Sequence, residues 1–349
     1  MTIKEIADIA GVSTATVSRV MNNTDGHVSA ETRQRIKQII AKEEYRPSRI
    51  ARSLRENKTR TIGVLCEDIT AFQTPTIING INQFLEQKQY QVILHDSRLI
   101  QKTNGNFSKI VQYKKDLQDA ADLFKASKVD GMIYVALMDH DISDIVPDTD
   151  LEMVGVYCYA DHANTVCVTY DNQRIVKEIV NRFVQNKKKK IGIITGDMTV
   201  KPSKLRFESY KEALAENGIT FNKTYVLEGG GWEYDFGVVA ARQYLAMTEE
   251  KRPDAILAMN DFLALGFIET VEQAGIQIPW DVEIIGFDNR EACRFSRPRL
   301  STIDLPLKEM GYAAAELVYN KLNNIKHGSQ TENENITFAC RIITKESCT

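Results

Sequence analysis

The sequence predicts a small all-α head followed by a larger body of the α/β class, with two lobes of doubly wound parallel sheet. Three observations predict this. Apolar residues recur at helical spacing over residues 1–46, whereas from Thr61 onward short apolar runs alternate with helical stretches. The chain has 349 residues, too many for one ordinary core. Charge divides in the same way: residues 1–60 carry 12 Lys and Arg against 7 Asp and Glu, while the remainder carries 32 against 40.

The composition is typical of a soluble globular protein, with 43% hydrophobic and 26% charged residues. No run of 18 apolar residues and no export signal occurs, so we expect a cytoplasmic protein that contacts no membrane. The six cysteines are scattered without a CxxC pair, and the five histidines are equally dispersed. We therefore expect buried or incidental thiols, no metal site and no cofactor. A basic head on an acidic body predicts that only the head contacts a polyanion.

The first helix of the head is predicted to follow Thr2. Thr2 and Glu5 fit a capping box, in which each side chain satisfies a backbone amide at the helix start. The apolar residues that follow fall on one face: Ile3, Ile6, Ala7 and Ala10. Gly11 ends this helix.

A second helix follows after a tight turn capped by Ser13, and it has two unlike faces. The apolar face consists of Val17, Val20 and Met21. The other face is short and polar: Thr14, Ala15, Ser18, Arg19 and Asn22. A third helix, from Ser29, brings Ile36, Ile39 and Ile40 over the first two. Three helices with a sharp turn between the first two predict a helix-turn-helix unit at residues 1–46.

The short polar face predicts a helix that reads DNA. Hydroxyl and methyl side chains let a helix backbone approach base edges and phosphates, and Arg19 can bond to guanine O6 and N7. A helical hairpin with an ordinary Ser and Thr surface is the alternative. For residues 47–60, composition alone favours a solvated linker. A short helix there would have only two sizeable apolar residues, Ile50 and Leu54, so it would need its dimer mate and DNA to fold.

The body, residues 61–349, contains seven apolar runs typical of buried parallel strands: TIGVLCED, YQVILHD, VDGMIYVA, LEMVGVYCY, KIGIITGD, DAILAMND and VEIIGFDN. Helices are predicted between them at 76–88, 172–185, 204–217 and 262–274. The strands and helices form two such alternating sets along the chain, which predict two lobes. The N-lobe is expected at about 61–162 and 293–322, and the C-lobe at about 163–292 and 323–349.

Polar residues end several predicted strands, where ligands of open α/β sheets bind: Asp68, Asp197, Asn260 with Asp261, and Asp288. Each is alternatively a helix cap. Together with Arg206 and Trp232 they suit a saccharide, because hydroxyl pairs take bidentate partners and the apolar face of the ring stacks on an indole. A core role is the alternative for Trp232.

Residues 2–58 resemble the DNA-binding head of the lactose/galactose repressor (LacI/GalR) family, through TIKEIADIAGVSTATVSRVMN, HVSAETRQRI and YRPSRIARSLR. The body resembles the two-lobed, periplasmic-binding-protein-like core of the same family. The resemblance implies DNA contacts by three groups of residues. Base-reading positions are Thr14, Ala15 and Arg19, and positions near phosphates or the groove edge are Thr16, Ser18, Asn22 and His27. The resemblance also implies that residues 47–60 are a hinge helix and linker, in which Arg49, Ala51 and Leu54 contact DNA and Leu54 is a wedge in the minor groove.

The resemblance also implies effector contacts. Arg206, Asn260 and Asp288 match effector-contacting positions, and Trp232 matches an aromatic platform of sugar-responsive members. From the N-lobe we add Phe72 and Thr74. Residues 95–117 are longer than usual in the family and are expected to form a surface loop or an extended helix.

The function expected from these features is that of a sequence-specific transcriptional regulator rather than an enzyme. We expect a homodimeric repressor of carbohydrate-utilisation genes, associated with the nucleoid, whose affinity for double-stranded operator DNA is controlled by a mono- or disaccharide. The alternative is a co-repressed regulator that responds to a purine-like metabolite or a phosphocarrier protein. A carbohydrate enzyme with a DNA-binding appendage is less favoured, because no nucleophile elbow, metal set or phosphate loop occurs.

Overall fold

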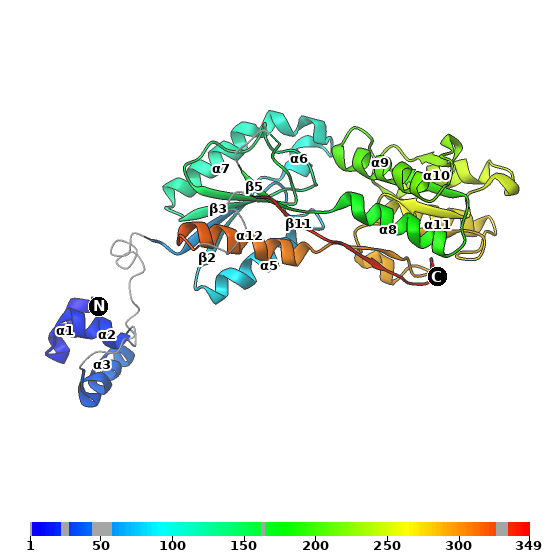
Figure 1. The fold of residues 1–349 in the computed structure, drawn as a ribbon. Helices are drawn as coiled ribbons and strands as arrows, with labels where there is room; N and C mark the ends of the chain where they lie inside the picture. The colour runs from blue at the N-terminus through cyan, green and yellow to red at the C-terminus, as the bar shows by residue number, and fades with distance from the viewer. Residues whose placement is uncertain (1, 22–27, 44–57, 162–164, 326–333) are drawn as a thin grey trace. The chain divides into compact units, whose positions relative to one another are not determined.

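The computed structural model describes residues 2–21, 28–43, 58–161, 165–325 and 334–349. It divides into two compact units, residues 1–60 and residues 61–349 (Figure 1). The first unit is the predicted head and the second is the predicted body.

The head begins with helix α1 (Ile3–Ala10), whose capping box is present as predicted. The amide of Thr2 donates to Glu5 Oε2 at 2.7 Å, and the amide of Glu5 donates to Thr2 Oγ1 at 3.3 Å. Gly11 ends the helix with a φ of 63°, a left-handed conformation that glycine adopts without strain.

Helices α2 (Thr14–Met21) and α3 (Ala30–Lys42) complete the head. Ser29 caps α3 by accepting a hydrogen bond from the amide of Thr32 at 3.2 Å. All three helices contribute to one small core, which holds Ile6, Ala7, Ala10, Val17, Val20 and Ile36. The described part of the head is therefore the predicted helix-turn-helix unit.

The first lobe of the body is built on a parallel sheet of six strands in the order β11-β5-β4-β3-β1-β2. These strands are β1 (Thr61–Cys66), β2 (Gln91–Asp96), β3 (Gly131–Val135), β4 (Glu152–Val156), β5 (Val166–Tyr170) and β11 (Ile336–Phe338). The strands in the middle of this sheet are almost wholly buried, which explains their continuous apolar runs.

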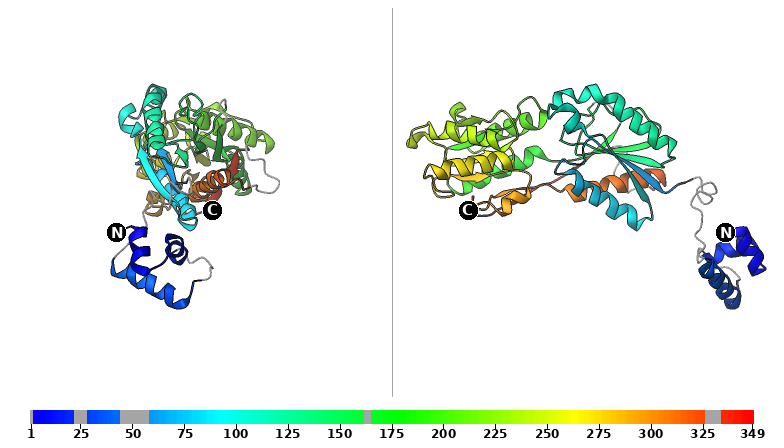
Figure 2. Two further views of the ribbon diagram at one scale, coloured as in Figure 1. Left: turned by 90° about the vertical axis from the view of Figure 1, so that its left-hand side faces the viewer. Right: turned by 180° about the vertical axis from the view of Figure 1, so that it is seen from behind.

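Helices cover both faces of this sheet (Figures 1 and 2). They are α5 (Thr74–Gln87), α6 (Leu99–Thr103), the 3₁₀ segment η1 (Phe107–Tyr113), α7 (Lys114–Ala126) and α12 (Leu307–Leu322). Helices α5 and α12 lie side by side on one face, and α7 lies on the other. A side-chain carbon added at Gly80 would lie 2.0 Å from the carbonyl oxygen of Lys308, and one at Gly311 would lie 2.1 Å from that of Ile77. Glycine at both positions allows the two helices to pack this closely.

The second lobe is a parallel sheet in the order β7-β6-β8-β9, with helices packed against it. The strands are β6 (Ile191–Thr195), β7 (Val226–Glu228), β8 (Ala255–Ala258) and β9 (Glu283–Ile285). The α-helices are α8 (Asn172–Gln185), α9 (Lys201–Glu216), α10 (Tyr234–Leu245) and α11 (Asp261–Gln273). Three short 3₁₀ segments are also present: η2 (Lys223–Tyr225), η3 (Glu249–Lys251) and η4 (Glu291–Arg294).

The chain passes between the lobes three times: after β5, between β10 (Thr302–Asp304) and α12, and between β11 and β12 (Arg341–Ile343). Strands β10 and β12 pair antiparallel beside these crossings. This topology corrects the lobe boundaries expected from the sequence. Strand β5 and residues 334–338 belong to the first lobe rather than the second, whereas residues 293–304 pack with the second. An apolar run predicts a strand but not the sheet that it joins.

Candidate functional site

Helix α2 carries five of the residues predicted to contact DNA: Thr14, Ala15, Thr16, Ser18 and Arg19. Its Val17 and Val20 are buried in the head core, so the opposite face is turned to solvent. Thr14, Ala15 and Arg19 are exposed there. The amide of Thr16 donates to Ser13 Oγ at 3.2 Å, which fixes the start of the helix. The structure thus groups these residues on one short helix.

Five other predicted DNA contacts lie outside the described residues: Asn22, His27, Arg49, Ala51 and Leu54. Of the predicted hinge and linker, residues 47–60, only residues 58–60 are described. The hinge helix and its contacts therefore stay predictions.

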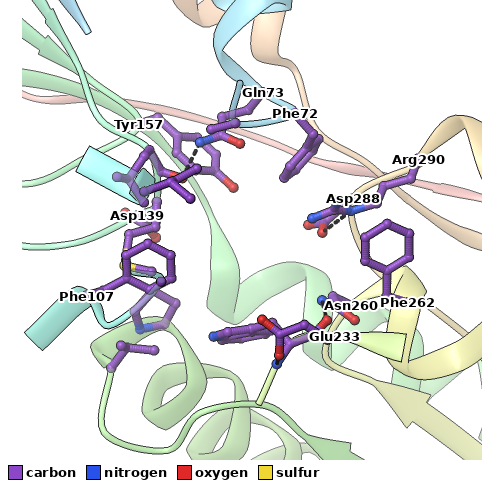
Figure 3. Close-up of a pocket in the computed structure, with 18 of the residues that line it drawn as sticks. Phe72, Gln73, Phe107, Asp139, Tyr157, Glu233, Asn260, Phe262, Asp288 and Arg290 are labelled. Atoms are coloured by element: carbon purple, nitrogen blue, oxygen red, sulfur yellow. Dashed lines mark hydrogen bonds and ion pairs between the residues drawn. The ribbon is translucent and has the colours of Figure 1, made fainter. Parts of the chain in front are cut away.

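A cavity of about 350 Å³ lies between the two lobes of the body (Figure 3). First-lobe residues that line it follow the carboxyl ends of strands, including Phe72 after β1, Asp139 after β3 and Tyr157 after β4. Second-lobe residues do the same, including Asn260 after β8 and Asp288 after β9. The cavity is therefore at the edge of the sheets where the sequence placed a ligand site.

The cavity brings together most of the predicted effector residues. Its walls include Phe72, Arg206, Trp232, Asn260 and Asp288. Thr74 is not among the lining residues: it is the first residue of α5 and is fully buried. Asp68 and Asp197 are also absent from the walls, because their carboxylates serve local turns by accepting from the amides of Thr70 and Thr199.

Arg206 lines the cavity, and each of its three side-chain nitrogens donates a hydrogen bond within the protein. Its Nε donates to Asn172 Oδ1 at 2.9 Å, and its two terminal nitrogens donate to the carbonyl oxygen of Met259 and to the hydroxyl of Tyr170. The guanidinium carbon also lies 3.6 Å from the ring centroid of Phe287. Arg206 thus joins the end of β5 in the first lobe to the second lobe and holds the cavity in shape.

Asn260 and Trp232 form one unit. Asn260 caps α11 by accepting from the amide of Leu263 at 2.8 Å, and its Nδ2 donates to the carbonyl oxygen of Trp232 at 2.8 Å. The indole packs against the backbone of Gly196, where an added side-chain carbon would lie 2.6 Å from the ring. Trp232 lines the cavity and is also partly buried against the core, so its role as an aromatic platform for a ligand stays a prediction.

Arg290, which sequence reasoning missed, is held between two aromatic rings. Its guanidinium carbon lies 4.1 Å from the ring centroid of Phe72 in the first lobe and 4.3 Å from that of Phe262 in the second. Nε lies 3.4 Å from Asp288 Oδ2. Figure 3 shows the side chain entering the cavity between these rings. The stack contributes cation–π attraction while leaving the edge of the guanidinium for a ligand.

Two carboxyl groups near Arg290 are perturbed by burial. Burial raises the pKa of Asp288, although the cations of Arg290 and Arg206 oppose the shift. Burial and the neighbouring Asp288 raise the pKa of Asp261 to about 7. Asp261 accepts hydrogen bonds from the hydroxyl of Thr302 and from the amide of Arg290. Burial therefore favours the neutral form of both carboxyl groups.

On the first-lobe side Asp139 is 5% exposed, and burial raises its pKa to about 6, although the cation of Arg206 opposes the shift. Its Oδ2 accepts from Asn172 Nδ2 at 2.7 Å. Behind it, His140 Nε2 lies 2.9 Å from Oε1 of the buried Glu67. Burial lowers the pKa of His140, but the carboxylates of Glu67 and Asp139, together with a backbone hydrogen bond at Asp141, outweigh it and the pKa is raised. A polar network thus runs from the cavity into the first lobe.

The segment 95–117, for which we expected a surface loop or an extended helix, contributes a wall of the cavity. It contains the short helical pieces α6 and η1, and its Ile100, Gly105 and Phe107 line the cavity. Sequence reasoning did not predict this role. A signal was present, because it begins at the carboxyl end of β2, at the same edge as the other walls.

Within the residues that the structure describes, no cluster of three or more His, Cys, Asp or Glu side chains has the arrangement of a metal site. The helices described there include none with the length and apolar character needed to span a membrane.

A helix-turn-helix head on a two-lobed α/β body with a cavity between its lobes defines the class of ligand-responsive DNA-binding regulators. Comparison with known proteins agrees: residues 2–48 match the model of bacterial regulatory proteins of the lacI family, and residues 180–348 match the periplasmic binding protein-like domain. The chain belongs to the lacI family and is a DNA-binding transcriptional regulator.

Two relatives illustrate the match. The transcriptional repressor PurR of Photobacterium profundum is 32% identical over 93% of both chains. The ribose operon repressor of Haemophilus influenzae is 30% identical over 95% of this chain and 94% of its own.

Solved structures share the fold. The Lac repressor dimer bound to operator and an anti-inducer has a TM-score of 0.76 at 21% identity, covering 99% of this chain and 98% of its own. A complex of the regulator CelR with cellobiose has a TM-score of 0.63 at 23% identity, covering 99% of both chains.

Proposed function

We propose that this regulator represses carbohydrate-utilisation genes as a homodimer and that a small sugar, bound between the lobes, controls its affinity for operator DNA. One observation carries the proposal: the cavity takes its walls from both lobes of the body. A ligand that contacts both walls favours one arrangement of the lobes, and this preference is what an allosteric effector requires. The ribose operon repressor among the relatives supports a carbohydrate role.

The chemistry of the cavity suits a sugar. Trp232 and Tyr157 offer apolar ring faces, while Arg290 and Asp288 offer donors and acceptors at one edge. A pyranose has the same division, with apolar faces and hydroxyl groups around its rim. We assign effector contacts to these four residues and a positioning role to Arg206, each of whose three side-chain nitrogens already donates a hydrogen bond within the protein.

For the head we propose that α2 enters the major groove. Thr14, Ala15 and Arg19 read base edges, while Thr16 and Ser18 lie near phosphates. A dimer presents two such helices to a pseudopalindromic operator, as expected for this type of motif. The Lac repressor dimer on its operator is a structural precedent for the assembly. Such a protein works on the nucleoid in the cytoplasm.

The test is a thermal-shift screen of mono- and disaccharides, followed by calorimetry on each compound that raises the melting temperature. A compound that binds should also change the affinity for the promoter of the regulator's own gene by about tenfold or more. Sugars that bind without any effect on DNA affinity, or a panel in which none binds, would contradict the proposal. Incubation of the bound sugar with the protein should release no product.

A planar metabolite such as a purine base is the second candidate. The aromatic side chains of Phe107, Tyr157 and Trp232 around the cavity favour it, because such rings stack on planar ligands as readily as on sugars. Hypoxanthine and guanine therefore belong in the same screen, together with a phosphocarrier protein. Tight binding of a purine with no response to any sugar would establish this candidate in place of the first.

A further inference from the structure

Arg206 is a buried cation without a carboxylate partner. The residue is 4% exposed, and its hydrogen bonds go to neutral oxygen atoms of Asn172, Met259 and Tyr170. Among the residues that the structure describes, no carboxylate forms an ion pair with it. A buried charge is costly unless an opposite charge lies close to it. The cavity wall therefore holds positive charge that direct contacts do not neutralise.

Arg290 adds a second cation to this wall. Its guanidinium group is held between the rings of Phe72 and Phe262, which carry no oxygen or nitrogen acceptor. Nε lies 3.4 Å from Asp288 Oδ2, whereas strong hydrogen bonds between charged groups are roughly 2.7–2.9 Å long. Neither terminal nitrogen has a hydrogen-bond partner within the part of the chain that the structure describes. One edge of the guanidinium, with two parallel donors, is therefore available to a ligand.

Three carboxyl groups also line the cavity: Asp139, Glu233 and Asp288. Glu233 is exposed, so solvent weakens the field of its charge. Asp288 lies beside Nε of Arg290, and Figure 3 shows Asp139 on the opposite side of the cavity from this pair. Burial raises the pKa of both aspartates, that of Asp139 to about 6, because it disfavours their charged forms. These groups therefore compensate the two guanidinium groups only in part, and none of them occupies the free edge of Arg290.

A carboxylate or a phosphate group fits this free edge. Such groups accept two parallel hydrogen bonds from a guanidinium, and these bonds are roughly twice as strong as those between neutral groups. A neutral hydroxyl group would use the same donors without gaining this attraction. The rest of the cavity suits a sugar ring, because Trp232 and Tyr157 provide apolar faces and Asn260 provides polar atoms.

We propose that the effector is an anionic sugar, either a sugar acid or a sugar phosphate, whose carboxylate or phosphate group accepts two hydrogen bonds from the terminal nitrogens of Arg290. The inference rests on the proposed function and narrows it from sugars in general to those that carry a negative charge. Arg290 then determines specificity through its charge and its paired donors, and Phe72 and Phe262 keep those donors in place.

The test measures calorimetric affinities at neutral pH for matched sugars that differ in charge. Glucose, galactose and mannose are each compared with the uronic acid and with the phosphate ester formed at the terminal carbon. The anionic form of the preferred sugar should bind at least about tenfold tighter than its neutral parent. Because sugar acids and sugar phosphates are separate arms, the arm that binds identifies the anionic group.

Three variants test the role of the charge at Arg290. Arg290→Gln removes the charge but keeps a planar polar group, and it should lower the ratio of anionic to neutral affinity about tenfold or more. Arg290→Lys keeps the charge without the paired donors and should lower the ratio by less. Arg299→Gln is the matched control, because Arg299 is exposed, pairs with Glu346 at 2.8 Å and does not line the cavity. Its ratio should equal that of the wild type.

A neutral sugar that binds the wild type as tightly as its acid and its phosphate ester would overturn the inference and leave the proposed function standing. An unchanged ratio in Arg290→Gln would show that Arg290 does not hold the anionic group. Failure of every sugar to bind, neutral or anionic, would remove the proposed function as well. If Arg290→Gln does not fold, as judged by circular dichroism, Arg290→Lys decides, and an unchanged ratio in that variant overturns the inference.

Discussion

At the scale of single residues, the cavity contains two kinds of side chain. Some hold the site in shape through hydrogen bonds within the protein, and others have hydrogen-bonding atoms available for the proposed ligand. Arg206 and Asn260 were predicted from the sequence to contact the effector. Most of their hydrogen bonds, however, are made to protein groups such as the hydroxyl of Tyr170 and the amide of Leu263. Arg290 is stacked between two rings and donates from Nε to Asp288 Oδ2 at 3.4 Å, so under the proposed function its terminal nitrogens are the donors that meet the sugar. The two arginines therefore have different roles in one site.

Arg290→Lys keeps the charge but loses the planar group that stacks between Phe72 and Phe262. We expect effector affinity to fall about tenfold or more, measured by calorimetry, with little change in melting temperature. Arg299→Ala is the matched control, because Arg299 is exposed and pairs with Glu346 at 2.8 Å outside the cavity. Equal affinities in wild type and Arg290→Lys would remove Arg290 from the site.

Asp139→Asn tests the buried carboxyl group of the first lobe. Burial raises the pKa of Asp139 from 3.8 to about 6, so the native state favours the protonated form. Its stabilising contribution is complete below pH 4 and is lost as the pH rises through 6. Relative to Asp139→Asn, the free energy of unfolding of the wild type should fall by up to ~3 kcal/mol between pH 4 and pH 7, measured by urea denaturation. Asp144→Asn, at an exposed position nearby, should show no such trend. A constant difference across this range would contradict the assignment.

At the scale of elements, apolar patterning predicted most of the architecture. The helices expected at 172–185 and 262–274 correspond to α8 and α11, and the capping box of α1 is present. The sequence did not predict which sheet contains β5, because pairing with strands far apart in the chain decides it. Arg290 and Phe107 were missed for a related reason. Each follows the carboxyl end of a strand, β9 or β2, but only the folded topology shows which side chains there reach the cavity.

Gly311→Ala tests the close packing of α12 on α5. In an open helix this change stabilises, because alanine has the better helix propensity. Here the added carbon would lie 2.1 Å from the carbonyl oxygen of Ile77, so the helices must separate. We expect a loss of ~1–3 kcal/mol in the free energy of unfolding, measured by urea denaturation. Glu309→Ala, at an exposed position of α12, should change it far less. A stabilised Gly311→Ala would show that the two helices are not in tight contact.

At the scale of the whole molecule, the protein consists of two units with different tasks. The head presents Arg19 and its neighbours on one exposed face of α2. The body holds a cavity whose walls come from both lobes, and three chain crossings link those lobes. Family membership establishes that the protein regulates transcription by binding DNA. The central claim is that occupancy of the cavity sets the strength of that binding.

The most direct test uses fluorescence anisotropy to measure the affinity of the protein for two DNA duplexes at physiological salt, one from the promoter of the regulator's own gene and one of scrambled sequence. Both affinities are measured with and without the sugar identified by calorimetry. The account predicts a preference for the promoter that changes about tenfold or more when the sugar is added. Arg19→Ala should lose about 1–3 kcal/mol of promoter affinity, relax base preference and leave sugar affinity unchanged. Equal binding to promoter and scrambled DNA, whichever compound is supplied, would contradict the account.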